Sequence, residues 1–269
     1  MEAIGLGDIA PFEIVNSERI DDTERYVELL YSRRQRRGAL LRDCQRWVNQ
    51  DRNVFAACMV ACGDADGMVT GLTRSYWGSL EKVLRVLDPK PGHRLFGLSI
   101  LLAHDKTVLI ADTTVNETPS PEELADIAVQ SAEKARSLGH EPRVALLSYS
   151  DFGYPSAGKT TRIREAVRLL DARDVDFEYD GEMSVDIALD SDLRSLFPFC
   201  RLSGPANVLV MPGLHAANIA SKLVQHLGGG TVIGPLLLGL EKPVQIVQPG
   251  ATVSDVLNLA AFAAADADG

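Results

Sequence analysis

The chemistry-bearing pattern that is most specific in this sequence is GYPSAGKT at residues 153–160, which matches the phosphate-loop pattern GxxxxGK followed by Ser or Thr. In such a loop, main-chain N–H groups surround a phosphate and the lysine, here Lys159, neutralises its charge. The pattern arises by chance in about one chain in a hundred of this length, so a flexible strand-to-helix loop is the alternative interpretation. Ser148 and Ser150 precede the loop and indicate a ligand crevice under either interpretation.

Acidic residues supply three further candidates. Asp112 follows the apolar run TVLIA, as in a strand that holds a metal ion, although it precedes the phosphate-loop pattern. Asp180, Glu182 and Asp186 fall near a strand end, where paired carboxylates can act as general acid and base. The alternative is that they are hydrogen-bonded structural groups. Residues 64–67, DADG, begin like a calcium loop, but no glutamate closes the twelve-residue pattern, so we expect a turn.

Basic residues gather at one place in the chain. Arg33, Arg34, Arg36 and Arg37 form a run at the end of a predicted helix, where positive charge favours the helix C-terminus on a solvated face. One of them pointing into a cleft would bind an anion. Lys222 lies on a predicted helix as well, and is either a solvated lysine or a phosphate contact if that helix borders a cleft.

Composition narrows the class of protein. The chain has 269 residues, with 27 Lys and Arg against 37 Asp and Glu, and a formal net charge of −10. This balance argues against a nucleic-acid or membrane-surface binder, which needs a basic footprint. No apolar run approaches the ~20 residues of a membrane-spanning helix, and the N-terminal residues do not resemble a secretory signal.

Cysteine and histidine spacing argues against a metal or disulfide framework. The four cysteines form no CxxC pair, and the five histidines form no HExxH motif. We therefore expect no metal site in this chain and a cytoplasmic location, where thiols stay reduced. The cysteines are Cys44, Cys58, Cys62 and Cys200.

Hydrophobic periodicity and turn residues predict alternating helices and strands. The expected helices cover residues 17–38 (capped by Ser17), 40–62, 79–88, 120–139 (capped by Ser120), 160–173, 215–228 and 254–267. The expected strands cover residues 68–73, 95–103, 107–115, 143–150, 177–189 (running into a loop), 206–212 and 243–250. Runs such as VALLSYS and NVLVMP are apolar without alternation, which is typical of strands covered on both faces. The fold class is therefore α/β with a largely parallel sheet, and PKPG at residues 89–92 is a candidate hinge.

Four segments carry a family resemblance: RVALLSYS, DGEMSVDIAL, SGPANVLVMPGLHAANIASKLVQHLGG and IGPLLLGLEKPVQIV. Together they resemble the phosphate acetyl/butyryltransferases, in the same order along nearly the whole chain. Residues 49–94 resemble the stretch typical of one subgroup, the C-terminal domain of the bacterial hybrid NADP-dependent malic enzymes.

The resemblance implies a two-lobed fold of the isocitrate/isopropylmalate dehydrogenase type, with mostly parallel sheets and coenzyme A (CoA) bound in the interlobe cleft. Residues 1–91 and 237–269 would form the first lobe, without the family's N-terminal strand and helix. Residues 92–236 would form the second lobe, through which the members pair as homodimers. The malic-enzyme catalytic domains, with their NADP and divalent metal sites, would lie outside this chain and would be its partners in a higher oligomer.

Carried over residue by residue, the family's catalytic set is incomplete. Arg34 and Asp255 match a phosphate-binding arginine and the aspartate that assists the thiol of CoA. A Ser-Arg pair falls on Gln248 and Pro249, and a further arginine falls on Glu81. Loss of a single charge-stabilising donor typically costs ~3 kcal/mol of transition-state stabilisation. We therefore expect no efficient acetyl transfer.

The function expected from this resemblance is a regulatory, oligomerising domain that binds acetyl-CoA as an allosteric inhibitor. One alternative is an active phosphate acetyltransferase, and another is a P-loop nucleotide-binding protein. For Asn207 and Asn218, the alternative to ligand binding is a structural role as capping and loop-bonding residues. The expected ligand-binding residues are Arg34, Ser148, Ser150, Lys159, Asp186, Asn207, Asn218, Lys222 and Asp255.

Overall fold

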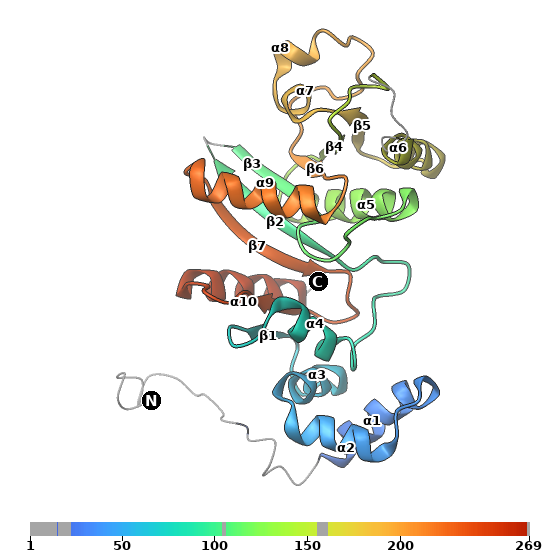
Figure 1. The fold of residues 1–269 in the computed structure, drawn as a ribbon, viewed down its shortest axis with the longest axis vertical. Helices are drawn as coiled ribbons and strands as arrows, with labels where there is room; N and C mark the ends of the chain where they lie inside the picture. Colours follow the sequence, from blue (N-terminus) through green and yellow to red (C-terminus); the bar gives the residue numbers. More distant parts are fainter. Residues whose placement is uncertain (1–14, 16–22, 104–105, 155–160, 268–269) are drawn as a thin grey trace.

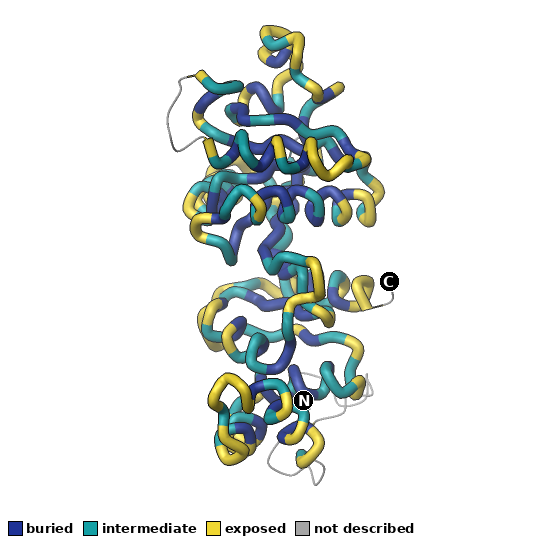
Figure 2. Tube along the Cα trace, turned by 90° about the vertical axis from the view of Figure 1, so that its right-hand side faces the viewer, coloured by how far each residue is buried: buried dark blue, intermediate teal, exposed yellow. Residues whose placement is uncertain are grey.

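The computed structural model of the chain describes residue 15 and residues 23–103, 106–154 and 161–267. Ser17 and Lys159, with the rest of residues 155–160, lie outside the described residues. The molecule is elongated, with a six-stranded sheet towards one end and the helices that follow the N-terminus at the other (Figure 1). Buried positions run through its middle along the whole length (Figure 2).

The larger sheet confirms the predicted α/β class with mostly parallel strands. Its order is β5–β4–β6–β3–β2–β7, in which β5, β4, β6 and β3 are mutually parallel and β2 is antiparallel to both of its neighbours, β3 and β7. The strands are β2 (Phe96–Ala103), β3 (Lys106–Ala111), β4 (Arg143–Leu147), β5 (Glu178–Met183), β6 (Val208–Val210) and β7 (Thr231–Leu238). The hairpin expected from the two apolar runs at residues 95–115 is therefore the antiparallel pair β2–β3.

Both faces of the larger sheet are covered, which explains the strands without alternation. Leu109 and Val144 face the core shared with α5 and α6, whereas Val108 and Ala145 face a second core that includes α7. The helix α9 runs along β3 and β7. The helices around this sheet are α5 (Pro121–Ser137), α6 (Thr161–Arg173), α7 (Val185–Leu189), α8 (Ser191–Arg194) and α9 (Leu214–Leu227).

A smaller sheet of two parallel strands, β1 and β8, lies beside the larger one. Around it pack the N-terminal helices and the last helix of the chain, α10, which contacts β1, β7 and β8. These elements are α1 (Glu24–Arg34), η2 (Gln35–Arg37), α2 (Leu41–Gln50), α3 (Arg52–Cys62), β1 (Met68–Gly71), α4 (Tyr76–Val83), β8 (Val244–Val247) and α10 (Val253–Ala267).

Helix-end signals explain one correct prediction and one error. Ser120 and Glu123 form the capping box that begins α5, as the sequence predicts. The single helix expected over residues 40–62 is wrong, because the chain is extended at Asp51 and a new helix starts there. The carboxylate of Asp51 accepts hydrogen bonds from the N–H groups of Asn53 and Val54, so it caps α3 and separates it from α2.

Two further elements differ from the prediction. The strand β7 was not predicted, since its run TVIGPLLL contains Gly234 and Pro235, which usually indicate a turn. Residues 177–189 were expected to be a strand running into a loop, but the strand ends at Met183 and Val185–Leu189 form the short helix α7. The lobe boundaries remain a prediction; the boundary expected after residue 236 falls inside β7. In the part of the chain that is described, no helix is long and apolar enough to cross a membrane.

Candidate functional site: a cleft between the two sheets

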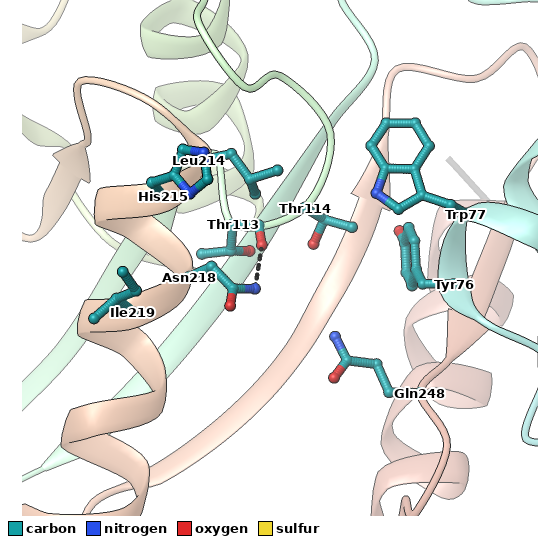
Figure 3. A pocket seen from close by; sticks show the side chains of 9 residues that line it. All are labelled: Tyr76, Trp77, Thr113, Thr114, Leu214, His215, Asn218, Ile219 and Gln248. Carbon is teal, nitrogen blue, oxygen red and sulfur yellow. Dashed lines mark hydrogen bonds between the residues drawn. The ribbon is translucent and has the colours of Figure 1, made fainter.

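A cleft opens where the larger and the smaller sheet meet. It consists of two neighbouring hollows of about 280 and 360 Å³, which share the lining residues Thr113, Asn218 and Gln248. The smaller hollow, called the acceptor pocket below, lies between α4 and α9, as Figure 3 shows. The larger hollow, called the main groove, lies between α9, β7 and the start of α10. The acceptor pocket is lined by Tyr76, Trp77, Thr113, Thr114, Leu214, His215, Asn218, Ile219 and Gln248.

Strand direction explains why the cleft forms here. The parallel strands β3 and β6 of the larger sheet end at this place, and so do β1 and β8 of the smaller sheet. Loops after the carboxyl ends of parallel strands form the usual ligand crevice of open α/β sheets. The segments that follow β1, β6 and β8 lead into α4, α9 and α10, so three helix N-termini border the cleft. Their main-chain N–H groups favour a polar or anionic ligand.

Asp112 orders the turn after β3 that leads into the cleft. Its carboxylate is buried and accepts hydrogen bonds from the N–H groups of Gly97 (2.8 Å), Thr114 (2.8 Å) and Val115 (3.0 Å). Its other oxygen accepts from the N–H and the side-chain amide of Asn116, both at 2.6 Å. These bonds fix the turn after β3 and present the threonine at position 114 to the acceptor pocket. Both oxygens of this carboxylate therefore serve the turn, which is a structural role.

The wall on the α9 side is tied to this turn. The side-chain amide of Asn218 donates to the main-chain oxygen of Thr113 at 3.2 Å, which the dashed line in Figure 3 marks. One turn further along the same helix, Lys222 is exposed and lines the main groove. Both positions were predicted as ligand residues, and the structure brings both to the cleft.

The opposite wall is the turn that joins β8 to α10. Ala251 N–H donates to the oxygen of Gln248, and Pro249 and Gly250 occupy the centre of the turn, with Gly250 at a φ of +85°. Pro followed by a residue of positive φ is the arrangement of a type II turn. Asp255 closes the start of α10 by accepting from Thr252, and it also lines the main groove. The predicted residue Asp255 is therefore in the cleft, with its carboxylate engaged as a helix cap.

Charge in the described part of the cleft is sparse. Among the described lining residues, Lys222 is the only lysine or arginine and Asp255 the only carboxylate. Positions 248 and 249 contribute an amide and a proline ring, neither of which carries a positive charge. The described cleft therefore offers an anionic group one side-chain cation, Lys222, beside the main-chain N–H groups at the helix N-termini.

Other predicted residues lie elsewhere. Arg34 lines neither hollow; its buried guanidinium donates to the oxygens of Leu84 (2.6 Å) and Arg85 (2.5 Å) and pairs with Asp88 at 3.1 Å. Glu81 is exposed and paired with the side chain of Arg85 at 2.6 Å, which lowers the pKa of Glu81. The uncharged residues Gln248 and Pro249 therefore line the cleft, whereas Glu81 lies outside it.

The serines after β4 and the carboxylates of β5 lie outside both hollows. Ser150 donates to Glu182 at 2.8 Å, and Ser148 lies 3.3 Å from Ser150. Asp180 accepts from the N–H of Arg201 at 2.8 Å. None of these four residues lines the cleft, and separate partners occupy Asp180 and Glu182, so the structural interpretation of these carboxylates fits.

Two predicted ligand residues and one predicted turn lie outside the cleft. Asn207 accepts from the N–H of Arg143 and donates to the oxygen of Glu141, each at 2.8 Å, which is the structural alternative named for it. Asp186 is exposed in the first turn of α7, outside the cleft. Residues 64–67 form the expected turn, where Asp64 accepts from the hydroxyl of Tyr26 at 2.6 Å.

Apart from Asn218 and Gln248, the sequence interpretation missed the residues of the acceptor pocket. Tyr76 and Trp77 begin α4 directly after its cap Ser75, and Thr113 and Thr114 follow the end of β3. The two threonines follow a predicted strand, and ligands usually bind at the carboxyl ends of parallel strands. This position was the available signal for a binding site. Among the described residues, no group of three or more His, Cys, Asp and Glu side chains has an arrangement that could hold a metal ion.

Comparison with known proteins places the chain in a family. Residues 2–264 match the phosphate acetyl/butaryl transferase family, and the chain belongs to it. It is 58% identical over 266 residues to the NADP-dependent malic enzyme of Rhizobium meliloti, which covers 99% of this chain and 35% of that relative. The chain therefore spans about a third of the length of this curated relative.

Solved structures of the family have the same fold. A phosphotransacetylase from Streptococcus pyogenes superposes with a TM-score of 0.91 at 32% identity, covering 96% of this chain and 79% of that one. The EutD phosphotransacetylase from Staphylococcus aureus gives a TM-score of 0.85 at 32% identity, covering 97% of this chain and 80% of that one.

Proposed function

We propose that this chain is the phosphotransacetylase-like regulatory domain of an NADP-dependent malic enzyme. It binds acetyl-CoA in the cleft as an allosteric inhibitor and does not transfer acetyl groups. The observation that carries this proposal is the turn at residues 248–251. The chain belongs to a transferase family, yet at this turn its cleft is lined by Gln248 and Pro249. An amide and a proline leave the cleft open to a ligand and provide no cation for a reacting phosphate.

The missing cation at residues 248 and 249 affects the free energy of the transition state more than the free energy of ligand binding. Transfer to or from phosphate concentrates negative charge on oxygens that need fixed donors, and loss of one such donor typically costs ~3 kcal/mol. A long ligand such as CoA gains affinity from many contacts, among them an anionic end that Lys222 can meet at the groove. Binding can therefore persist where catalysis is lost.

Regulation requires that acetyl-CoA bind one arrangement of the chain better than another. Two crossing segments join the parts that carry the two sheets, one at residues 89–92 and one after β7. They lie side by side: Lys90 N–H donates to the oxygen of Gly239 at 2.9 Å, and Pro89 bridges to Leu240. Bending at this paired crossing is the movement by which the cleft opens and closes.

The proposal includes partners and location. Residues 92–236 form a lobe that pairs with a second copy, and the exposed leucines at positions 223 and 227 of α9 support such a contact. The malic-enzyme catalytic domains are the other partners in a higher oligomer in the cytoplasm. They, and not this chain, hold NADP and the divalent metal.

Isothermal titration with acetyl-CoA and with free CoA, beside a thiol-release assay with acetyl phosphate, tests this function. We expect micromolar binding of acetyl-CoA without turnover. The variant Lys222→Met should bind both ligands more weakly, whereas Lys242→Met, which removes an exposed lysine outside both hollows, should not. Robust turnover would instead favour an active phosphate acetyltransferase, for which Asp255 lies in the cleft. Absence of binding would leave only an oligomerising role.

A further inference from the structure

Lys134 on α5 is a buried lysine that lies outside the cleft. Its side chain is only 10% exposed, although lysine is rarely buried in proteins unless it is paired. The ammonium group forms an ion pair with the carboxylate of Asp266 and lies 5.5 Å from the centre of the Phe262 ring. Both partners belong to α10, so Lys134 joins α5 to the last helix of the chain.

This contact holds α10 at the end that is far from the cleft. The start of α10 lies at the main groove, which Ala251, Asp255 and Leu259 line. Asp266 lies eleven residues after Asp255 in the sequence, which is about 16 Å along a helix. Because a helix moves as a rigid element, a displacement of its last turn also displaces the wall of the main groove.

The remaining contacts of α10 hold it less specifically. Its fully buried positions, Leu259 and Ala263, form one narrow stripe on the helix. Hydrophobic contact is non-directional, so such a stripe fixes the position of a helix along its axis less strictly than an ion pair between two defined groups does. Among the described residues, the Lys134–Asp266 pair is the one side-chain hydrogen bond or ion pair between α10 and another element.

The same pair connects the two parts of the molecule that meet at the cleft. The helix α5 covers the larger sheet, whereas α10 packs on both strands of the smaller sheet and on β7. In Figure 1, α10 lies between the larger sheet and the helices that follow the N-terminus. A lock between α5 and α10 therefore sets how far the start of α10 stands from α9 across the main groove.

We propose that Lys134 is a positioning residue for ligand binding in the main groove. It holds the last turn of α10 on α5, and through the length of α10 it keeps the wall that carries Asp255 at its distance from Lys222. This inference rests on the proposed function, which supplies acetyl-CoA as the ligand. Coupling of binding free energies is reciprocal, so a ligand that binds more tightly when the Lys134–Asp266 pair is formed also stabilises that pair. The far end of α10 therefore responds to an occupied groove.

Titration calorimetry with acetyl-CoA on variants of the pair tests the positioning role. Lys134→Met keeps the aliphatic stem but removes the charge. It should weaken acetyl-CoA binding about 3–10-fold, a usual size for residues that act on a ligand from a distance. Asp266→Asn should have an effect of the same size, and the double variant should lose no more than either single variant, because the two groups act as one pair. Lys134→Arg, which keeps the charge, should bind as wild type does.

Arg136→Met is the matched control. Arg136 is also a cation of α5 in an ion pair, but its partner Asp176 lies outside α10. Its replacement should leave the affinity for acetyl-CoA unchanged, and thermal unfolding shows which variants fold. Equal acetyl-CoA affinity of folded Lys134→Met and wild type would overturn the inference and leave the proposed function in place.

Hydrogen exchange measured by mass spectrometry separates the positioning role from simple loss of stability. In wild type, acetyl-CoA should slow amide exchange at residues 262–267, which lie outside the groove. In Lys134→Met this slowing should disappear, while slowing at residues 248–255 persists. Slowing confined to the groove in wild type would contradict the coupling, even if every variant failed to fold.

A wild type that binds no CoA ligand would refute the proposed function, and the free protein then decides the positioning role. Faster exchange at residues 253–258 in free Lys134→Met than in free wild type would show that the lysine still positions the start of α10. Unchanged exchange there would overturn that role as well.

Discussion

The side-chain amide of Gln245 on β8 exchanges two hydrogen bonds with the main chain of Leu237 on β7. The N–H of Leu237 donates to Oε1 at 2.9 Å, and Nε2 donates to the oxygen of Leu237 at 3.2 Å. Both partners are buried. The two strands belong to different sheets, so a side chain here takes the place of a strand neighbour and joins the smaller sheet to the larger beside the cleft.

Removing this bridge should destabilise the whole fold. Gln245→Ala leaves a buried N–H and a buried carbonyl oxygen unpaired, so we expect the free energy of unfolding to fall by about 2–4 kcal/mol. Urea denaturation measures it. Gln50→Ala, at an exposed position at the end of α2, should stay within about 0.5 kcal/mol of wild type. A loss below about 1 kcal/mol in Gln245→Ala would mean that Leu237 finds other partners.

Arg34 should matter for stability and not for the ligand. Arg34→Met keeps the aliphatic stem but removes the donors to the oxygens of Leu84 and Arg85 and the partner of Asp88. We expect a loss of about 2–4 kcal/mol in urea denaturation and an unchanged dissociation constant for acetyl-CoA. Arg36→Met, at an exposed position, should change neither quantity. Weaker acetyl-CoA binding at unchanged stability would instead assign Arg34 to the ligand site.

A positive charge at position 249 should create affinity for a compact anion. Pro249→Arg places a guanidinium at the rim of the main groove, where the described lining has one lysine. Titration with inorganic phosphate and acetyl phosphate should detect binding in this variant that wild type lacks. Pro249→Gln loses the proline ring without gaining charge and is the matched control. Equal phosphate binding by wild type and Pro249→Arg would contradict the sparse charge assigned to the cleft.

Cys44 and Cys58 should be inert in the native protein. Both thiols are buried, and burial raises the pKa of each, that of Cys58 to about 12. A raised pKa means that less of the reactive thiolate exists at pH 8, and burial also blocks reagent access. Ellman's reagent should therefore modify these two positions only after denaturation, when all four thiols of the sequence react. Mass spectrometry identifies the sites, and rapid native modification of Cys58 would contradict the packing around α3.

Local signals decided which parts of the fold were predictable. The capping box of Ser120 and Glu123 lies within four residues, so its helix was predicted with its start. Asp51 also caps a helix, but it lies inside residues 40–62, whose apolar residues continue in helical spacing on both sides of it. The periodicity therefore predicted one helix where the structure has two. The strand β7 contains Gly234 and Pro235, and only its pairing with β2 across more than a hundred residues makes it a strand.

The sequence by itself determined the α/β class, the family and the absence of charge at positions 248 and 249, because periodicity, motif order and residue type are written along the chain. Tertiary structure alone decided which residues share the cleft. Asn218 and Thr113 lie 105 positions apart and meet because β3 and β6 end side by side. The same folding turns Arg34 away from the cleft and places Tyr76 and Thr114, from distant parts of the chain, in the lining of one pocket. Side-chain direction depends on packing against distant residues, and local sequence does not encode it.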